Sequence, residues 1–318
     1  MTEKVRRFAW RSTVEDVLTG VDLTGKTVLI TGTNSGIGSI TAQSLALHGA
    51  HVVMANRNIP ASEKLRQEIR FMTPNAKVDI LSIDLSSLKT VKAAAEEFLS
   101  KGWPLHILIL NAGVYKPAKT VTEDGLEMTF GVNHVAHFYL TEQLLPKLKA
   151  SAPSRVVIVA SHGHIYTKIK TSLSTEEKIK ILAPAAGTKD WAPFGLYSCS
   201  KLCNILFAFA LHRRVHESGV NVYALHPGVI KTELLRDYGF LGKIGFFFSS
   251  PFLKSLEQGA ATTVYCASST DLNNISGRYF ASCWDAEKRL HTELARDEAL
   301  QDALWIHTEN LLRNYESQ

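Results

Sequence analysis

Short apolar segments alternate along the chain with longer segments that mix apolar and polar residues. The apolar segments are near-continuous runs rich in Val, Ile and Leu at residues 27–31, 51–55, 78–83, 106–110, 156–160 and 220–225. Uninterrupted apolar runs of this length are typical of strands that helices cover on both faces. Four of the intervening segments are expected to be helices: residues 39–49, 88–101, 124–149 and 197–218.

This alternation predicts the fold class. Strands that alternate with helices are joined by right-handed crossovers, which gives an α/β fold with a doubly wound parallel sheet. We expect residues 1–24 to form an N-terminal extension and residues 25–318 to form a single domain. Two segments interrupt the pattern: residues 168–193, a polar stretch expected to be a surface insertion, and residues 230–251, which are rich in aromatic side chains.

The composition excludes several classes of protein. Apolar residues make up 45% of the chain and charged residues 20%, which is too apolar for a disordered protein. The net charge of +5 is spread along the sequence, so no nucleic-acid partner is expected. Residues 1–20 lack the apolar core of a secretory signal, and no uncharged apolar run is long enough to cross a bilayer. With 4 cysteines we expect no disulfide framework and a cytoplasmic location.

The first expected strand runs into a glycine-rich loop that leads to a helix. The loop consists of Gly32, Thr33, Asn34, Ser35, Gly36, Ile37 and Gly38. Glycines allow a tight turn and a close approach of the backbone to a pyrophosphate, which then sits on the free N–H groups at the helix N-terminus. Such a loop can also be an ordinary strand-to-helix turn, so the sequence around it has to decide.

The loop spacing G-x-x-x-G-x-G, preceded by Thr31, resembles the cofactor loop of the short-chain dehydrogenase/reductase family. Later motifs extend the resemblance in the family's order: Asn111-Ala112-Gly113, Ser161, the pair Tyr197 and Lys201, and Pro227-Gly228 with Thr232. The resemblance implies a Rossmann fold and hydride transfer with a nicotinamide cofactor. It implies that these segments bind the nucleotide, and that Asp84 and Leu85 contact its adenine. Epimerases and dehydratases of the extended family share the fold but usually carry G-x-x-G-x-x-G, which is absent here.

Tyr197 and Lys201 have the spacing of a proton-transfer pair. At positions i and i+4 they lie on one face of a helix, one turn apart. A phenol with a pKa near 10 is a poor proton donor and acceptor at neutral pH, and a nearby ammonium group favours the phenolate and lowers that pKa. The other reading of the same spacing is a surface helix with an unrelated Tyr and Lys; the upstream glycine loop favours the pair. Tyr197 and Lys201 are also expected to contact the cofactor.

Two further site residues follow from the resemblance. Ser161 comes directly after the fifth strand, at the edge where open α/β sheets bind ligands, and by resemblance it would hydrogen-bond the substrate oxygen. Asn133 matches the family's helix asparagine, which supports a water that relays protons to the lysine. All four catalytic positions of the family are therefore present.

The end of the second strand points to the cofactor. Enzymes that prefer NAD carry Asp or Glu there to bind the ribose 2′-hydroxyl, whereas this chain has Ala55-Asn56-Arg57. Because a carboxylate is absent and Arg57 is available to bind a 2′-phosphate, we expect NADP(H). The alternative is that Arg57 points to solvent.

The histidines and cysteines suggest no metal site. His134 and His137, and likewise His162 and His164, lie close in sequence, but no Cys or carboxylate cluster joins them. Cys199 shares its helix face with Cys203, and packed thiols are expected there rather than a redox pair.

Longer strings are similar to the retinol dehydrogenase branch of the family, although its N-terminal membrane anchor is not evident here. The resemblance implies interconversion of an alcohol and a carbonyl on an apolar substrate such as a retinoid, steroid or lipid aldehyde or ketone. The substrate loop, about residues 229–256, has aromatic side chains that could line a pocket, pack on the core or, at residues 246–248, touch a membrane surface. A homo-oligomer is left open. The alternative function is a nucleotide-bound scaffold or sensor with incidental turnover.

Overall fold

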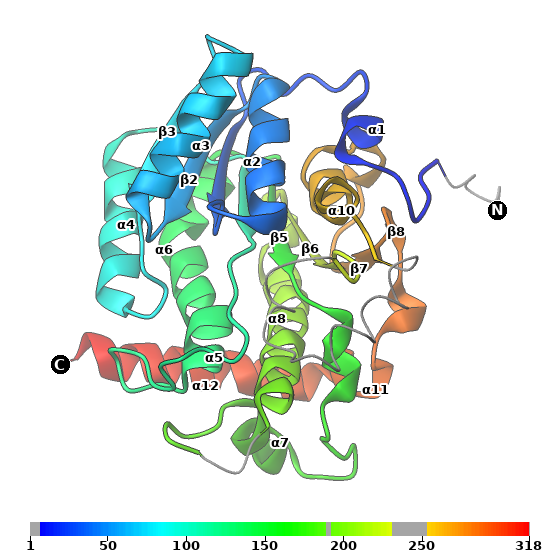
Figure 1. Cartoon of the computed structure of the whole chain (residues 1–318). Coiled ribbons are helices and arrows are strands. Elements are labelled where there is room, and N and C mark those ends of the chain that lie inside the picture. The colour runs from blue at the N-terminus through cyan, green and yellow to red at the C-terminus, as the bar shows by residue number, and fades with distance from the viewer. Residues whose placement is uncertain (1–6, 189–191, 231–252, 318) are drawn as a thin grey trace, which may run out of the picture.

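A computed structural model describes residues 7–188, 192–230 and 253–317 of the chain. Its centre is one eight-stranded sheet in the order β3-β2-β1-β4-β5-β6-β7-β8, with helices on both faces (Figure 1). The first seven strands are parallel and β8 is antiparallel to β7. The expected doubly wound α/β fold in a single domain is therefore confirmed.

The first six strands lie where the apolar runs predicted them, to within two residues at each end. Their bounds are β1 Thr27–Thr31, β2 His51–Asn56, β3 Val78–Ser82, β4 Ile107–Leu110, β5 Ser154–Val159, β6 Val220–His226, β7 Arg278–Ala281 and β8 Trp284–Asp285. The sequence did not predict β7 and β8, because runs of four and two residues are too short to show a hydrophobic pattern.

The helices divide into two layers. Their bounds are α1 Val14–Leu18, α2 Gly36–Leu47, α3 Ile59–Met72, α4 Leu88–Ser100, α5 Met128–Phe130, α6 Ala136–Ala150, α7 Thr175–Leu182, α8 Pro193–Val215, α10 Leu256–Ser268, α11 Thr292–Ala295 and α12 Glu298–Glu316. A π-helical turn, Gly131–Val135, joins α5 to α6.

Alternate residues of each central strand pack against the helices on opposite faces of the sheet. On β1, Leu29 belongs to the core formed with α4, α6 and α8, whereas Val28 and Ile30 belong to the core formed with α1, α2, α3 and α10. Successive side chains of a strand point to opposite faces, so an all-apolar strand is buried on both sides. This is why the strands are apolar without interruption.

The segment 168–193 is more than a surface insertion. It contains α7, which begins in a capping box at Ser174 and buries Ile179 and Leu182 in the core beside α8. A helix of eight residues with two buried apolar positions gives only a weak periodic signal, which explains why the sequence pattern did not reveal it.

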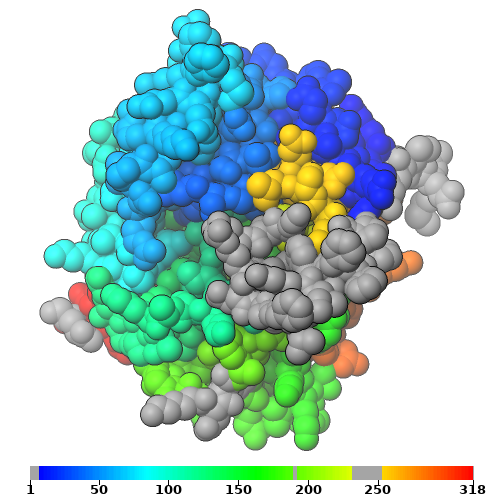
Figure 2. Space-filling model, in the orientation of Figure 1, coloured from blue at the N-terminus to red at the C-terminus, as the bar shows by residue number. Residues whose placement is uncertain are grey.

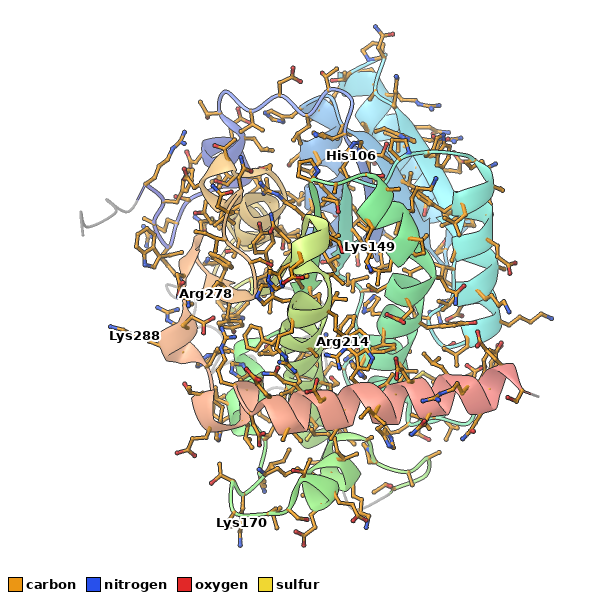
Figure 3. The ribbon with its side chains drawn as sticks, turned by 180° about the vertical axis from the view of Figure 1, so that it is seen from behind. His106, Lys149, Lys170, Arg214, Arg278 and Lys288 are labelled. Carbon is orange, nitrogen blue, oxygen red and sulfur yellow. The ribbon has the colours of Figure 1, made fainter. Side chains whose placement is uncertain are left out.

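The C-terminal helix α12 crosses the outside of α6 and α8 (Figure 3). Its Trp305 ring lies 4.7 Å from the ring of Phe138 and 5.9 Å from that of Phe207, centroid to centroid. The guanidinium of Arg214 lies over the indole at 4.2 Å, a cation–π contact. The helix therefore closes the outer side of this layer.

The helix that begins at Pro193 is long and apolar enough to cross a membrane by length and composition alone. Within the protein, 78% of its most apolar window is buried, between the sheet and α12. Burial by neighbouring elements accounts for this composition, as in the core helix of a soluble protein.

The N-terminal segment packs on the opposite layer. α1 contacts α10 and α2, and the ring of Phe8 lies 5.6 Å edge-on from that of Tyr265. In Figure 2 the gold atoms near the start of α10 adjoin the blue atoms of the N-terminal part. The segment before the first strand is thus part of the packed structure.

Candidate active site

The carboxyl ends of β1, β4, β5 and β6 bring the expected site residues to one edge of the sheet. Parallel strands all end on the same side, and this edge is where open α/β sheets bind ligands. The 111–113 turn at the end of β4 links two parts of the site that are far apart in sequence: Asn111 bonds to Gly32 of the glycine loop, and Gly113 lies against Lys201 of α8.

The glycine loop is packed too tightly for side chains at Gly32 and Gly38. A Cβ on Gly38 would overlap the carbonyl oxygen of Gly32 and lie 2.5 Å from Nδ2 of Asn111. A Cβ on Gly32 would lie 2.8 Å from the backbone of Ala112. Gly36 has φ +62°, a left-handed conformation that favours glycine. The loop can therefore lie close to a ligand, as a pyrophosphate requires.

The N-terminus of α2 fits a phosphate group. Ser35 occupies the N-cap, yet its side chain accepts no hydrogen bond from the N–H groups of the first turn. The unpaired N–H groups of a helix N-terminus and its dipole favour an anion. The backbone of this 12-residue helix thus offers a cradle for the cofactor pyrophosphate.

Thr31 and Asn111 hold the loop against the end of β4. The Thr31 hydroxyl accepts hydrogen bonds from the backbone N–H groups of Asn111, at 3.0 Å, and Ala112, at 3.1 Å. The Asn111 amide donates to the carbonyls of Thr31 and Gly32, both at 2.9 Å. These bonds place the 111–113 turn beside the glycine loop.

The end of β2 carries Asn56 where an NAD enzyme has a carboxylate. Its Oδ1 accepts from the backbone N–H of Thr33 at 2.7 Å, and its Nδ2 donates to the Thr33 and Ser62 hydroxyls at 2.6 and 2.9 Å. The buried amide thus ties the glycine loop to β2 and α3. The sequence analysis noted Asn56 only for the missing carboxylate and did not identify this role.

Arg57 and Asp84 lie together at the open side of the loop. The Arg57 side chain is 77% exposed and its Nη1 lies 3.5 Å from Oδ2 of Asp84. Burial acts to raise the pKa of Asp84, but hydrogen bonds from Ser86 and the charge of Arg57 outweigh it and leave the pKa below its ordinary value. An exposed guanidinium held by such a weak pair is free to turn toward an anion.

Tyr197, Ser161 and Lys201 form the centre of the site. Ser161 and Tyr197 both lie against Gly163: a Cβ on that glycine would be 3.3 Å from Oγ of Ser161 and 3.5 Å from the ring of Tyr197. The Lys201 ammonium donates to the Val159 carbonyl at 3.0 Å and lies 5.5 Å from the centre of the Tyr197 ring. The i,i+4 spacing on α8 therefore does bring Tyr and Lys to the end of β5.

The protonation of the pair differs from the expectation. Burial raises the pKa of Tyr197 above its ordinary value, although the nearby Ser161 hydroxyl acts in the opposite direction. Burial also lowers the pKa of Lys201, to about 8. The Lys201 ammonium is directed at the Val159 carbonyl, and burial has the largest effect on the pKa of Tyr197.

Lys201→Met should change the pH dependence of stability. The pKa of Lys201 is about 8 in the folded protein, against an ordinary value of 10.5. Between these values the unfolded chain binds a proton at Lys201 that the folded protein does not, so this residue contributes a rise in the free energy of unfolding with pH, whereas buried thiols such as Cys199 contribute a fall. From pH 7 to 10.5, urea unfolding should therefore give the variant a lower slope of unfolding free energy against pH than the wild type has. Lys170→Met, at an exposed lysine, should keep the wild-type slope; an unchanged slope in Lys201→Met would contradict the prediction.

Asn133 is linked to this centre by hydrogen bonds to Val114 and Ser200. Its side-chain Oδ1 accepts from the Val114 N–H at 2.7 Å, and its Nδ2 donates to the Val114 carbonyl and to the Ser200 hydroxyl at 3.1 and 3.0 Å. A Cβ on Gly113 would lie 3.3 Å from both Oδ1 of Asn133 and Nζ of Lys201. Asn133 and Lys201 therefore flank the same turn.

The family model for short chain dehydrogenases matches residues 26–172 and 178–239. The chain belongs to the short-chain dehydrogenase family. It is 43% identical to a WW domain-containing oxidoreductase of Gallus gallus, over 97% of this chain and 73% of that protein. It is 42% identical to retinol dehydrogenase 12 of Mus musculus, over 90% of this chain and 86% of that protein.

A solved structure supports the same fold. The crystal structure of a putative uncharacterized protein from Mycobacterium Paratuberculosis superposes with a TM-score of 0.70 at 29% identity, and the match covers 92% of this chain and 95% of that one. The short-chain dehydrogenase resemblance inferred from the motifs is therefore confirmed, and with it the oxidoreductase class.

The structure describes only part of the region between Tyr197 and the expected substrate loop. The ring of Tyr115 meets that of Tyr197 edge-on at 5.5 Å, and that of His226 lies 5.7 Å from His162. Gly228 has φ +103° and its Cα faces the Lys254 side chain. Thr232 and the aromatic residues 246–248 lie outside the described residues, as does most of the expected substrate loop.

The four cysteines are buried thiols. Burial raises the pKa of Cys199 to about 12 and that of Cys203 well above its ordinary value, which suits packed thiols. Among residues 7–188, 192–230 and 253–317, no three His, Cys, Asp or Glu side chains are grouped to hold a metal.

Proposed function

We propose that this short-chain dehydrogenase is an NADP(H)-dependent enzyme that interconverts an alcohol and a carbonyl on an apolar substrate. The observation that carries the proposal is the cluster at the end of β5, where Tyr197 and Ser161 lie against Gly163 beside the buried Lys201. A proton donor, a second hydroxyl and a cation at one point suit an oxygen that gains and loses charge. The nearby glycine loop suits a dinucleotide.

Each residue then has a chemical task. The bound nicotinamide would supply or accept the hydride. Tyr197 donates its phenolic proton to the substrate oxygen during reduction and takes it back during oxidation, while Ser161 hydrogen-bonds and orients that oxygen. The Lys201 ammonium stabilises the phenolate left after proton transfer, and Asn133 holds the 113–114 turn beside the lysine.

We assign Arg57 to the 2′-phosphate of NADP(H). The side chain of the uncharged Asn56 is already hydrogen-bonded to Thr33 of the glycine loop. The neighbouring Arg57 side chain is exposed. Gly32–Gly38, the 111–113 turn, Asp84, Leu85 and the Pro227–Gly228 turn with Thr232 would bind the remainder of the nucleotide.

Arg57→Gln should therefore weaken NADPH much more than NADH. A hydrogen bond to a charged group contributes about 1.5–3 kcal/mol, so we expect NADPH affinity to fall about 10- to 100-fold and NADH affinity to change little. Nicotinamide fluorescence titration measures both. Arg66→Gln, at an arginine of α3 paired with Glu63 at 2.6 Å, is the control and should bind as the wild type does. Equal wild-type affinities for NADPH and NADH would contradict the assignment.

An apolar substrate is supported by the retinol dehydrogenase relatives and by the aromatic rings near Tyr197. Retinoids, steroids and lipid-derived aldehydes or ketones are the classes that we propose. The four buried thiols suit the reducing cytoplasm, where we place the protein. Measurement has to decide whether it also contacts a membrane surface or forms a homo-oligomer.

The test is NADPH consumption by purified protein with retinal, steroid ketones and long-chain aldehydes. Turnover of one class would establish the enzyme and its substrate class. Tight NADPH binding without turnover of any carbonyl would instead favour a nucleotide-bound scaffold.

A further inference from the structure

His137, on the first turn of α6, bridges two parts of the site without reaching its surface. The side chain is 2% exposed. Its Nε2 lies 2.9 Å from the Thr31 hydroxyl at the end of β1, and its Nδ1 lies 3.2 Å from the main-chain carbonyl of Asn133. The sequence analysis considered this histidine only as a metal ligand.

The hydrogen bonds around Thr31 determine which nitrogen carries the proton. A hydroxyl has one proton to donate and two lone pairs. The Thr31 oxygen already accepts from the N–H groups of Asn111 and Ala112, so its own proton is directed to His137. Nε2 is therefore an acceptor, Nδ1 carries the proton, and Nδ1–H donates to the Asn133 carbonyl.

The ring stays neutral in this arrangement. Burial lowers the pKa of His137 to about 3, although the bond to Asn133 acts to raise it, and the charge of Lys201 lowers it further. A neutral imidazole with one donor and one acceptor satisfies both partners. An aliphatic side chain in its place would leave both of them without this bond.

Asn133 needs such support because it lies in the π-helical turn Gly131–Val135. A π turn breaks the i→i+4 bonding pattern of a helix, and such turns occur often at functional sites. The Asn133 side chain is bonded to Val114 and Ser200, while its carbonyl is bonded to His137. The imidazole thus fixes the backbone of the residue whose side chain holds the 113–114 turn next to Lys201.

We propose that His137 is a positioning residue for the reaction: Thr31 sets its Nδ1–H tautomer, and the bond from Nδ1–H to the Asn133 carbonyl fixes Asn133 and the turn beside Lys201. The inference rests on the proposed oxidoreductase function, because it assigns His137 a role in the catalytic rate. His137 does not touch the reacting atoms. Misplacing a catalytic group by about 1 Å can lower a rate about 100-fold, which sets the expected scale.

Two amide variants separate the two bonds of the ring. In His137→Asn the amide nitrogen takes the place of Nδ1 and can still donate to the Asn133 carbonyl, whereas the bond to Thr31 is lost. In His137→Gln the amide oxygen takes the place of Nε2 and can still accept from Thr31, whereas the bond to Asn133 is lost. Each variant loses one of two bonds, so we expect similar losses of thermal stability.

The rates should differ. We expect His137→Gln and His137→Leu to lower kcat about 10- to 100-fold at saturating NADPH, with little change in KM for NADPH, and His137→Asn to stay close to the wild type. His134→Leu is the matched control: His134 is 1% exposed in the same π-helical turn, but its Nε2 bonds to Thr308 of α12. This control should lose stability and keep its kcat.

The outcomes distinguish this inference from the proposed function. A wild type that turns over no carbonyl would overturn both. An active wild type with equal loss of kcat in His137→Asn and His137→Gln, or with the same loss in His134→Leu, would overturn the positioning role alone. An Nε2–H tautomer of His137 in the nitrogen-15 NMR spectrum of the wild type would also overturn it.

Discussion

Tyr197→Phe is expected to lower kcat for carbonyl reduction about 10²- to 10⁴-fold, the range that a positioned proton donor contributes. The variant keeps the ring that packs edge-on against Tyr115 and loses only the phenolic hydroxyl. NADPH should therefore still bind, while the substrate oxygen has no proton donor. Single-turnover NADPH oxidation, together with a fluorescence titration of NADPH, measures the two effects separately.

Tyr139→Phe is the matched control for this loss. Tyr139 lies on α6, and its hydroxyl donates to Glu316 near the end of α12 at 2.8 Å. Its removal deletes one phenolic hydrogen bond away from the site, so kcat should stay at the wild-type value. If Tyr197→Phe kept the wild-type rate, Tyr197 would not be the proton donor and the proposed mechanism would be wrong.

Gly38→Ala should have the largest effect on folding and cofactor binding. The added Cβ would overlap the Gly32 carbonyl oxygen and press on the Asn111 amide, which itself bonds to the ends of β1. The Gly32 carbonyl and the Asn111 amide are held together by a hydrogen bond, so neither can easily move away from the added Cβ. We therefore expect the free energy of unfolding to fall by about 3 kcal/mol or more. Urea unfolding and NADPH titration of the variant measure this result.

Gly36→Ala provides the comparison within the same loop. A Cβ at Gly36 has nothing within 4 Å, and the backbone has φ +62°. Only conformational strain opposes the substitution, which costs about 1–2 kcal/mol. A smaller loss of stability is thus expected than for Gly38→Ala. Equal losses in the two variants would show that close packing of Gly38 is not the cause.

The catalytic cluster shows why a motif does not specify its own electrostatics. The spacing of Tyr197 and Lys201 correctly places them at one point, and it suggested a lowered tyrosine pKa. In the folded protein, burial acts on both groups and disfavours the charged form of each, so the pKa of Tyr197 rises and that of Lys201 falls. The extent of burial depends on how β5 and the neighbouring turns pack around the pair. The spacing of two residues in the sequence cannot predict that packing.

The supporting residues were not predictable for a related reason. Asn56, Ser62 and His137 have no motif of their own, because each acts through partners that are distant in sequence: 23 residues separate Thr33 from Asn56, and 106 separate Thr31 from His137. A conspicuous signal did exist at Asn56, a polar residue at the end of an apolar strand. At His137 there was none beyond its proximity to Asn133.

The sequence by itself determined the first six strands, their alternation with helices, the parallel sheet, the glycine loop and the Tyr197–Lys201 pair. These features depend on local periodicity and on short spacings, which the chain carries without reference to its fold. The tertiary structure alone decided the short strands β7 and β8, the packing of α12 across α6 and α8, and the bond from His137 to Thr31. Those features exist only when distant segments are brought together, because their stabilising contacts lie between elements rather than within them.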